Sequence, residues 1–182
     1  ETYEKYYSTK VNPGFTTGAV FLIENKDKYG LYTEFLYSMK GKIVKSSAND
    51  YETNTANYQF LDLPIMFRLK FKQRKYDWYL MLGPQFSYWL SGRGSFDVYQ
   101  PDRDIIISHD YQLNFGEPIY TSDYMNVEDP NRLQMGLSLG SGFIVDMKNA
   151  NFLSLDIRLT FGHTYMGGYE SGTIPNIGLV DN

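Results

Sequence analysis

The chain has 182 residues, of which 42% are hydrophobic and 17% aromatic, and it carries a net charge of -4. It lacks cysteine, which excludes disulfides and thiolate chemistry, and no apolar run reaches the length of a transmembrane helix. No basic run is interleaved with aromatic residues, so we expect no nucleic-acid partner. Abundant tyrosine, phenylalanine and glycine favour an all-β fold, and residues 1–182 are expected to form a single domain.

The first part of the chain predicts two strands joined by a short turn. Residues 1–13 are polar and rich in tyrosine, so we expect a loop there. Residues 14–24 alternate least cleanly, because apolar side chains occur on both faces. A turn at 25–30 leads to residues 31–44, where mainly apolar odd positions oppose mainly polar even ones.

Residues 58–71 show the clearest alternation of the chain. Odd positions such as Leu63 and Phe67 are apolar, whereas Asp62 and Arg68 occupy even positions. Alternate side chains of a strand point to opposite faces, so one face is apolar and the other charged, whereas a helix would mix them. The pattern exceeds the usual soluble strand of about 5 to 6 residues and suits the roughly 9 to 11 that cross a bilayer.

Three further strands repeat this alternation at residues 78–91, 132–145 and 152–162. Short turns therefore alternate with long connections, as in outer-membrane barrels with periplasmic turns and external loops. A short strand extension is possible at residues 105–108. The expected external loops are at residues 45–57, 92–131 and 163–182.

The apolar face of these strands is expected to face lipid. A soluble lipocalin-like barrel would point the same face inward. However, six strands supply roughly 30 large apolar side chains, and an eight-stranded barrel has an interior barely wide enough for side chains. The predicted lipid-facing wall includes Leu61, Leu63, Ile65, Phe67, Leu69, Leu80, Leu82, Leu137, Leu155 and Ile157.

The opposite face is expected to line a narrow polar lumen. Isolated charges in such an interior are costly, so they should pair across strands in a network. One interpretation is a structural plug, which the narrow lumen favours, and the other is a gate or ion path. The charged side chains on this face are Glu34, Lys40, Asp62, Arg68, Lys70, Asp156 and Arg158.

The segment FLDLPIMFRLKF, followed by WYLMLGPQFSYWLSG, resembles the paired strand motifs of the PorT-type outer-membrane β-barrel family of Bacteroidetes. In that family an xLxIPLLLKxxF strand precedes an xYLxxGPxxxYLLS strand. The resemblance extends to GFTTGAVFLIENKDKYGLYTEFLYSMKGKIV and LSLDIRLTFGHT, and covers most of residues 14–164. It implies an antiparallel up-and-down barrel of eight strands, of which six are clear here. We therefore expect one further strand before residue 1 and one after residue 182.

The two histidines provide weak evidence for catalysis. His109 and His163 are both in expected loops, and neither has a second ligand at metal-binding spacing. Three aspartates, Asp102, Asp104 and Asp110, do not match a calcium loop. We therefore expect no catalytic residue, cofactor or metal site.

Taken together, the sequence predicts an integral protein of the bacterial outer membrane. The expected role is a non-catalytic anchor or accessory subunit that contacts lipid and other envelope proteins. The resemblance implies the type IX secretion and gliding apparatus as one setting. A small porin-like channel, an enzyme at the outer rim and a soluble carrier are the alternatives.

Overall fold

The computed structural model describes residues 7–25, 28–46, 52–72, 76–127, 129–147 and 152–162. Throughout these ranges the regular structure is β-strand, which confirms the all-β prediction, and no helix there is long and apolar enough to cross a membrane. The strands are β1 (Tyr7–Asn25), β2 (Tyr29–Ser46), β3 (Glu52–Lys72), β4 (Asp77–Gln100), β5 (Ile105–Asn114), β6 (Tyr124–Asn126), β7 (Leu133–Asp146) and β8 (Phe152–Gly162).

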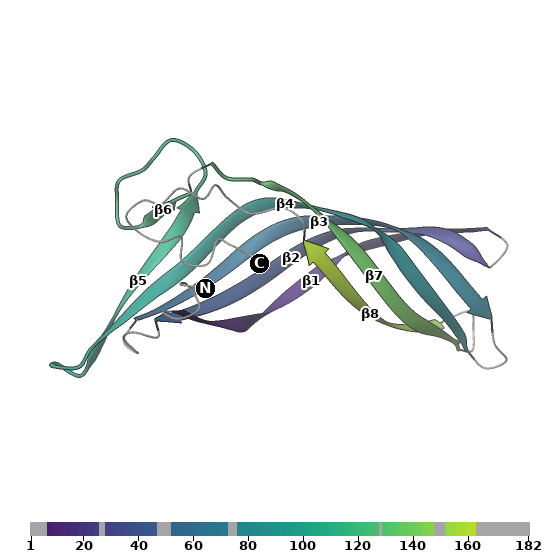
Figure 1. Cartoon of the computed structure of the whole chain (residues 1–182), viewed down its shortest axis with the longest axis horizontal. Coiled ribbons are helices and arrows are strands. Elements are labelled where there is room, and N and C mark those ends of the chain that lie inside the picture. Colours follow the sequence, from purple (N-terminus) through teal and green to yellow (C-terminus); the bar gives the residue numbers. More distant parts are fainter. Residues whose placement is uncertain are drawn as a thin grey trace.

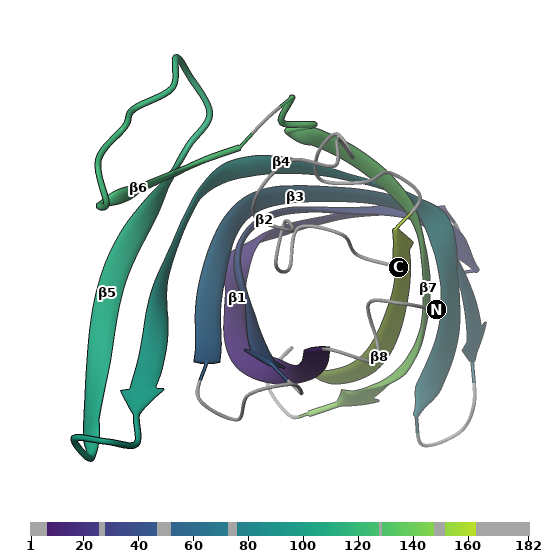
Figure 2. The ribbon, with the colours of Figure 1, turned by 60° about the vertical axis from the view of Figure 1, so that its left-hand side comes forward.

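The strands form one strongly curved sheet. Neighbours from β1 to β4 pair in chain order and antiparallel, and β7 pairs with both β4 and β8. Figure 2 shows this sheet curling around a central space, with β1 and β8 at the two edges of the curled part and β5 and β6 outside it. Within the described ranges these two edges do not pair with each other. The additional flanking strands remain a prediction.

Strand β4 changes its neighbour halfway along its length. Its first half pairs with β7 as far as Tyr88, whereas Arg93 to Gln100 pair with β5. The long end of β4 therefore leaves the wall together with β3 and β5 (Figure 1). We call residues 93–126, which comprise the hairpin of β4 and β5 and the return through β6, the outer extension, because they lie at the end opposite the short turns.

Several predicted loops prove to be strand. The first strand begins at Tyr7 rather than at residue 14, and β3 begins at Glu52, inside the predicted loop of residues 45–57. The predicted loop of residues 92–131 contains the end of β4, all of β5 and β6; the extension expected at 105–108 is thus longer. These segments lack apolar alternation but still pair by backbone hydrogen bonds. The predicted loop of residues 163–182 falls outside the described residues.

The burial of side chains along β3 follows the predicted alternation. Asp62, Pro64 and Arg68 are buried on the concave face, whereas Leu63 and Phe67 on the convex face are 39% and 57% exposed. Asp62 pairs in register with Ser87 of β4, so the polar side chains of neighbouring strands share the interior. The charged face therefore lines the space enclosed by the sheet.

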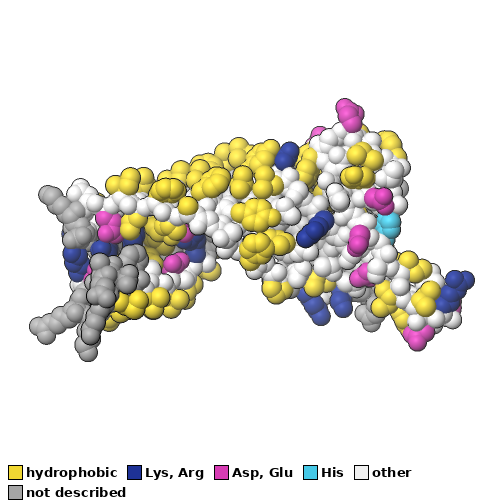
Figure 3. Space-filling view, turned by 180° about the vertical axis from the view of Figure 1, so that it is seen from behind, with side chains coloured by type: hydrophobic (Ala, Val, Ile, Leu, Met, Phe, Trp, Pro, Cys, Tyr) yellow, Lys and Arg dark blue, Asp and Glu magenta, His cyan; other side chains and the backbone are white. Residues whose placement is uncertain are grey.

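The convex face exposes a broad apolar surface. Figure 3 shows hydrophobic side chains covering the outer wall, with charged side chains in the hollow at one end. Soluble monomers rarely expose such an area. Contact with lipid stays our prediction for this wall. Of its ten predicted members, Leu61, Ile65 and Leu69 are partly exposed, and the exposed ones are Leu63, Phe67, Leu80, Leu82, Leu137, Leu155 and Ile157.

Replacing Ile157 by arginine tests this assignment. Ile157 is 75% exposed near the middle of β8, and arginine on a lipid face at the bilayer midplane costs about 2–4 kcal/mol. Urea unfolding in lipid vesicles should show that loss for Ile157→Arg. The control Tyr120→Arg changes a 91% exposed residue outside the wall, and should stay within about 0.5 kcal/mol. Equal stability of the two variants would contradict a lipid-facing wall.

Candidate functional site

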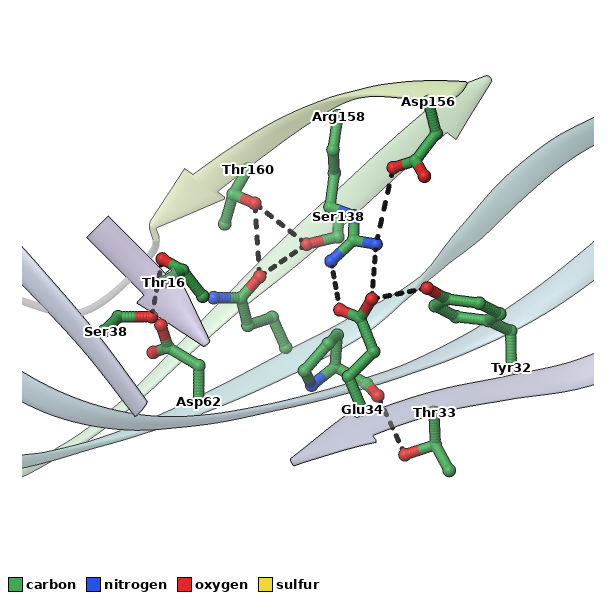
Figure 4. Close-up of polar contacts among 12 residues, drawn as sticks. Thr16, Tyr32, Thr33, Glu34, Ser38, Asp62, Ser138, Asp156, Arg158 and Thr160 are labelled. Atoms are coloured by element: carbon green, nitrogen blue, oxygen red, sulfur yellow. Dashed lines mark hydrogen bonds and ion pairs between the residues drawn. The ribbon is translucent and has the colours of Figure 1, made fainter. Parts of the chain in front are cut away.

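An ion pair crosses the interior of the barrel. Both terminal nitrogens of Arg158 on β8 donate to the carboxylate of Glu34 on β2, and the second of these hydrogen bonds measures 3.1 Å. The Tyr32 hydroxyl donates to the same carboxylate, and Asp156 lies 3.8 Å from Arg158 (Figure 4). Because the pair is bidentate, it holds the two distant strands at a fixed separation.

A neutral cluster lies beside this pair. The Ser138 hydroxyl of β7 donates to the side-chain oxygen of Gln85 on β4 at 2.6 Å, and the Thr160 hydroxyl of β8 donates to it at 3.1 Å. Ser138 is fully buried and Gln85 is 9% exposed. The cluster thus satisfies buried polar groups from three strands. Strand alternation assigns these three residues to the inner face but does not predict that they meet.

A second acidic group lies closer to the outer end. Asp62, which is 3% exposed, accepts a hydrogen bond from the Ser87 hydroxyl and lies 3.3 Å from the ammonium of Lys40. That ammonium also lies 4.6 Å from the ring centroid of Phe60. The Asp62 carboxylate therefore has partners from β2 and β4.

The end near the short turns holds the third charged group. Glu24 of β1 lies 3.4 Å from Arg68 and 3.0 Å from Lys70, both on β3. The guanidinium of Arg68 also stacks over the ring of Tyr79 at 4.0 Å. Glu24 is not among the predicted lumen charges, although its even position matches the polar face of this strand. Its place at the end of the least regular strand concealed its role.

All seven predicted lumen charges make ion pairs in the structure. Their ion pairs form three groups, around Arg158, Asp62 and Glu24. Tyr79 joins the first group to the third, because its hydroxyl donates to Asp156 at 3.4 Å and its ring lies under Arg68. A cavity of about 820 Å³ lies at the turn end and is lined by Glu24, Arg68 and, from β1, Val20. The interior is therefore crossed by side chains at its middle and more open near the turns.

Aromatic side chains pack the interior near the outer end. Trp89 is fully buried, and its ring lies 5.6 Å from Tyr58, 6.3 Å from Phe60 and 4.7 Å from Phe115. Phe115 follows β5, so the outer extension contributes to this packing. Arg132 donates to the carbonyls of Trp89 and Leu90, where β4 exchanges β7 for β5. This arginine satisfies backbone groups that lose their strand partner.

Tyr111 fixes the outer extension to the sheet. Its hydroxyl donates to the Asn54 side chain at 2.7 Å, and its ring lies directly over Gly94, where a Cβ atom would lie 2.4 Å from the hydroxyl oxygen. Burial raises the pKa of Tyr111 above its ordinary value. Gly94 is thus required for the close approach of this ring.

The histidine and aspartate candidates do not come together in the described part of the chain. The Nε2 atom of His109 is 2.6 Å from the Ser122 carbonyl oxygen, and Asp104 accepts a hydrogen bond from Tyr99. No group of three potential metal ligands occurs among the described residues, and His163 falls outside them. The absence of enzymatic activity stays a prediction.

Removing Arg158 should destabilise the barrel strongly. Breaking a buried ion pair by deleting one partner costs about 3–5 kcal/mol, because the other charge remains uncompensated. Arg158→Ala should show this loss in urea unfolding, whereas Arg158→Ala combined with Glu34→Ala should recover part of it. The exposed Arg103 gives the control Arg103→Ala, expected within about 0.5 kcal/mol of the original protein. Equal effects at residues 158 and 103 would contradict a buried pair.

Comparison with known proteins agrees with this architecture. Residues 2–164 match the family model described as an outer membrane protein beta-barrel domain. Neither a curated protein nor a solved structure matches the chain. The family match covers all eight strands of the structure and confirms the predicted location in the bacterial outer membrane. The chain therefore belongs to the outer membrane protein beta-barrel domain family.

Proposed function

We propose that this protein is a non-catalytic anchor or accessory subunit of an outer-membrane protein complex. The observation that carries the proposal is the pair between Arg158 and Glu34, which occupies the interior that a channel would need. The neutral cluster around Gln85 fills the neighbouring layer. A small barrel interior is only just wide enough for side chains, so these contacts narrow the interior between the described strands.

The outer extension supplies the surface for a partner. β4 has 24 residues, far more than a membrane crossing requires, and β5 returns beside its outer half. Ile106 is 66% exposed and Tyr120 is 91% exposed on this extension. Large apolar side chains exposed to water are typical of protein contact sites. A barrel whose interior is crossed by side chains, and which raises such a surface above the membrane, suits an anchor.

The setting of the complex is also a proposal. The paired strand motifs resemble PorT-type barrels of Bacteroidetes, which include members of the type IX secretion and gliding apparatus. That resemblance supports an envelope complex of this kind as the place to look for partners.

A small channel is the second candidate function, and the cavity near the turns favours it. Conductance in planar bilayers distinguishes the two. An anchor gives no steady conductance steps in its original form, whereas a channel conducts and responds when Arg68 or Arg158 is neutralised.

The anchor proposal predicts that partners leave the membrane with the protein. Native membranes would be extracted in mild detergent, the tagged full chain captured, and the bound proteins identified by mass spectrometry. We expect at least one envelope protein at a stoichiometric ratio. An unrelated barrel from the same membrane, captured in the same way, controls for general adhesion. Recovery of the protein alone, together with steady conductance, would overturn the anchor in favour of the channel.

A further inference from the structure

One edge of β5 is covered along only part of its length. β5 pairs with β4 on one side, while on the other side β6 pairs only with residues 112–114. The Gln112 amide donates to the Asp123 carbonyl at 2.9 Å, and the Asn114 carbonyl accepts from Val127 at 2.9 Å. The backbone groups of Gln112 and Asn114 therefore point away from β4.

The remaining outward groups follow from strand geometry. In an antiparallel ladder, the amide and carbonyl of one residue point to the same side, and successive residues alternate. Ile106, Ser108 and Asp110 thus present their backbone groups on the same side as Gln112. Among the described residues, no backbone hydrogen bond reaches these three from that side. They form an open hydrogen-bonding edge three residues long.

This edge has few of the usual protections against pairing, since Asp110 is the one charged side chain of β5. Exposed strand edges are normally interrupted by lysine, proline or a bulge. β5 contains no lysine or proline and pairs with β4 without a register shift. Instead, Ile105, Ile106 and Ile107 are 42%, 66% and 46% exposed. Figure 1 shows β5 projecting beyond the wall at the end opposite the short turns, where a partner can reach it.

The net charge of the hairpin indicates which charge its partner should carry. Residues 93–114 include four aspartates and two arginines, which gives a net charge of -2. A second copy would bring one acidic hairpin against another, so electrostatic complementarity favours a basic partner. The charged residues are Arg93, Asp97, Asp102, Arg103, Asp104 and Asp110.

The two faces of β5 favour different side chains on the partner. Ile106, Ser108 and Asp110 share one face, and Asp97 lies opposite Ser108 in register, so an added strand would meet two carboxylates beside Ile106 there. On the other face it would meet Ile105 and Ile107. Lysine or arginine suits the first face and apolar side chains suit the second.

We propose that residues 106–110 of β5 bind an extended segment of another protein by strand addition, and that this segment alternates apolar with basic residues. Backbone hydrogen bonds supply affinity in this mode, and alternate side chains supply specificity. The inference rests on the proposed anchor function and names how such an anchor holds its partner.

The first test uses labelled heptapeptides and the full chain in lipid nanodiscs. A peptide of alternating valine and lysine should bind about tenfold or more tightly than one of alternating valine and glutamate, measured by fluorescence anisotropy. Binding should weaken as salt screens the charges. Equal affinity for the two peptides would overturn the inference, as would capture of a second copy of the chain instead of the peptide.

The second test changes the edge itself. Ser108→Pro removes an outward amide that makes no bond to β4, a position where an edge strand tolerates proline. It should weaken binding of the valine–lysine peptide about tenfold, whereas Ser108→Ala, which keeps the amide, should stay within about twofold. Ile106→Lys provides a second variant that leaves the backbone unchanged and repels the basic peptide. Unchanged affinity in Ser108→Pro and Ile106→Lys would contradict strand addition.

Extraction of these variants separates this inference from the anchor function. Loss of the native partner in Ser108→Pro, but not in Ser108→Ala, would support both. If both variants still capture the partner, the anchor function is supported and strand addition at β5 is overturned. If even the original protein brings no partner, the anchor function fails, and peptide binding alone then decides whether the edge accepts a strand.

Discussion

Charge neutralisation inside a narrow barrel is the constraint on which this structure depends. A strand that turns leucines outward must turn its alternate residues inward, and here those residues include aspartate, glutamate, lysine and arginine. Buried charges of this kind are tolerated when each has a counter-charge and further hydrogen bonds. The pair between Glu34 and Arg158 satisfies this condition across the whole interior, from β2 to β8. The alternation places Glu34 and Arg158 on the inner face, and their pairing then fixes the distance between β2 and β8.

Strands β3 and β4 connect the wall of the barrel to the outer extension. Within the wall, β3 and β4 carry their charged side chains inward, beside Met66 and Met81, and apolar ones outward; beyond it, the same two strands continue in a sheet joined by β5. The change occurs near Trp89, where Arg132 satisfies the carbonyls left free as β4 exchanges partners. A filled barrel and a projecting sheet are thus parts of one continuous structure. The anchor proposal assigns a membrane role to the first and recognition to the second.

Sequence reasoning worked where the membrane imposes a pattern and was less effective elsewhere. The alternation from Leu61 to Phe71 identified the strand and its inner charges, because lipid and lumen demand opposite side chains. Residues 52–57 pair with the outer half of β4 but lie beyond the apolar wall, so they carry no such signal. Glu24 was not predicted as a lumen charge, because the strand that contains it alternates least regularly. The contact of Trp89 with Phe115 depends on how β5 returns, which local pattern does not encode.

The assignment of inner and outer faces can be measured directly, because the chain contains no cysteine. Single cysteines placed in turn at residues 61–70 would carry spin labels, and their accessibility to oxygen and to a water-soluble nickel reagent would be compared in nanodiscs. Lipid-facing labels favour oxygen. We predict a two-residue period, with high oxygen accessibility at odd positions such as Leu63 and Phe67 and low accessibility at Asp62 and Arg68. A reversed period, or none, would contradict a barrel with a charged interior and a lipid-facing wall.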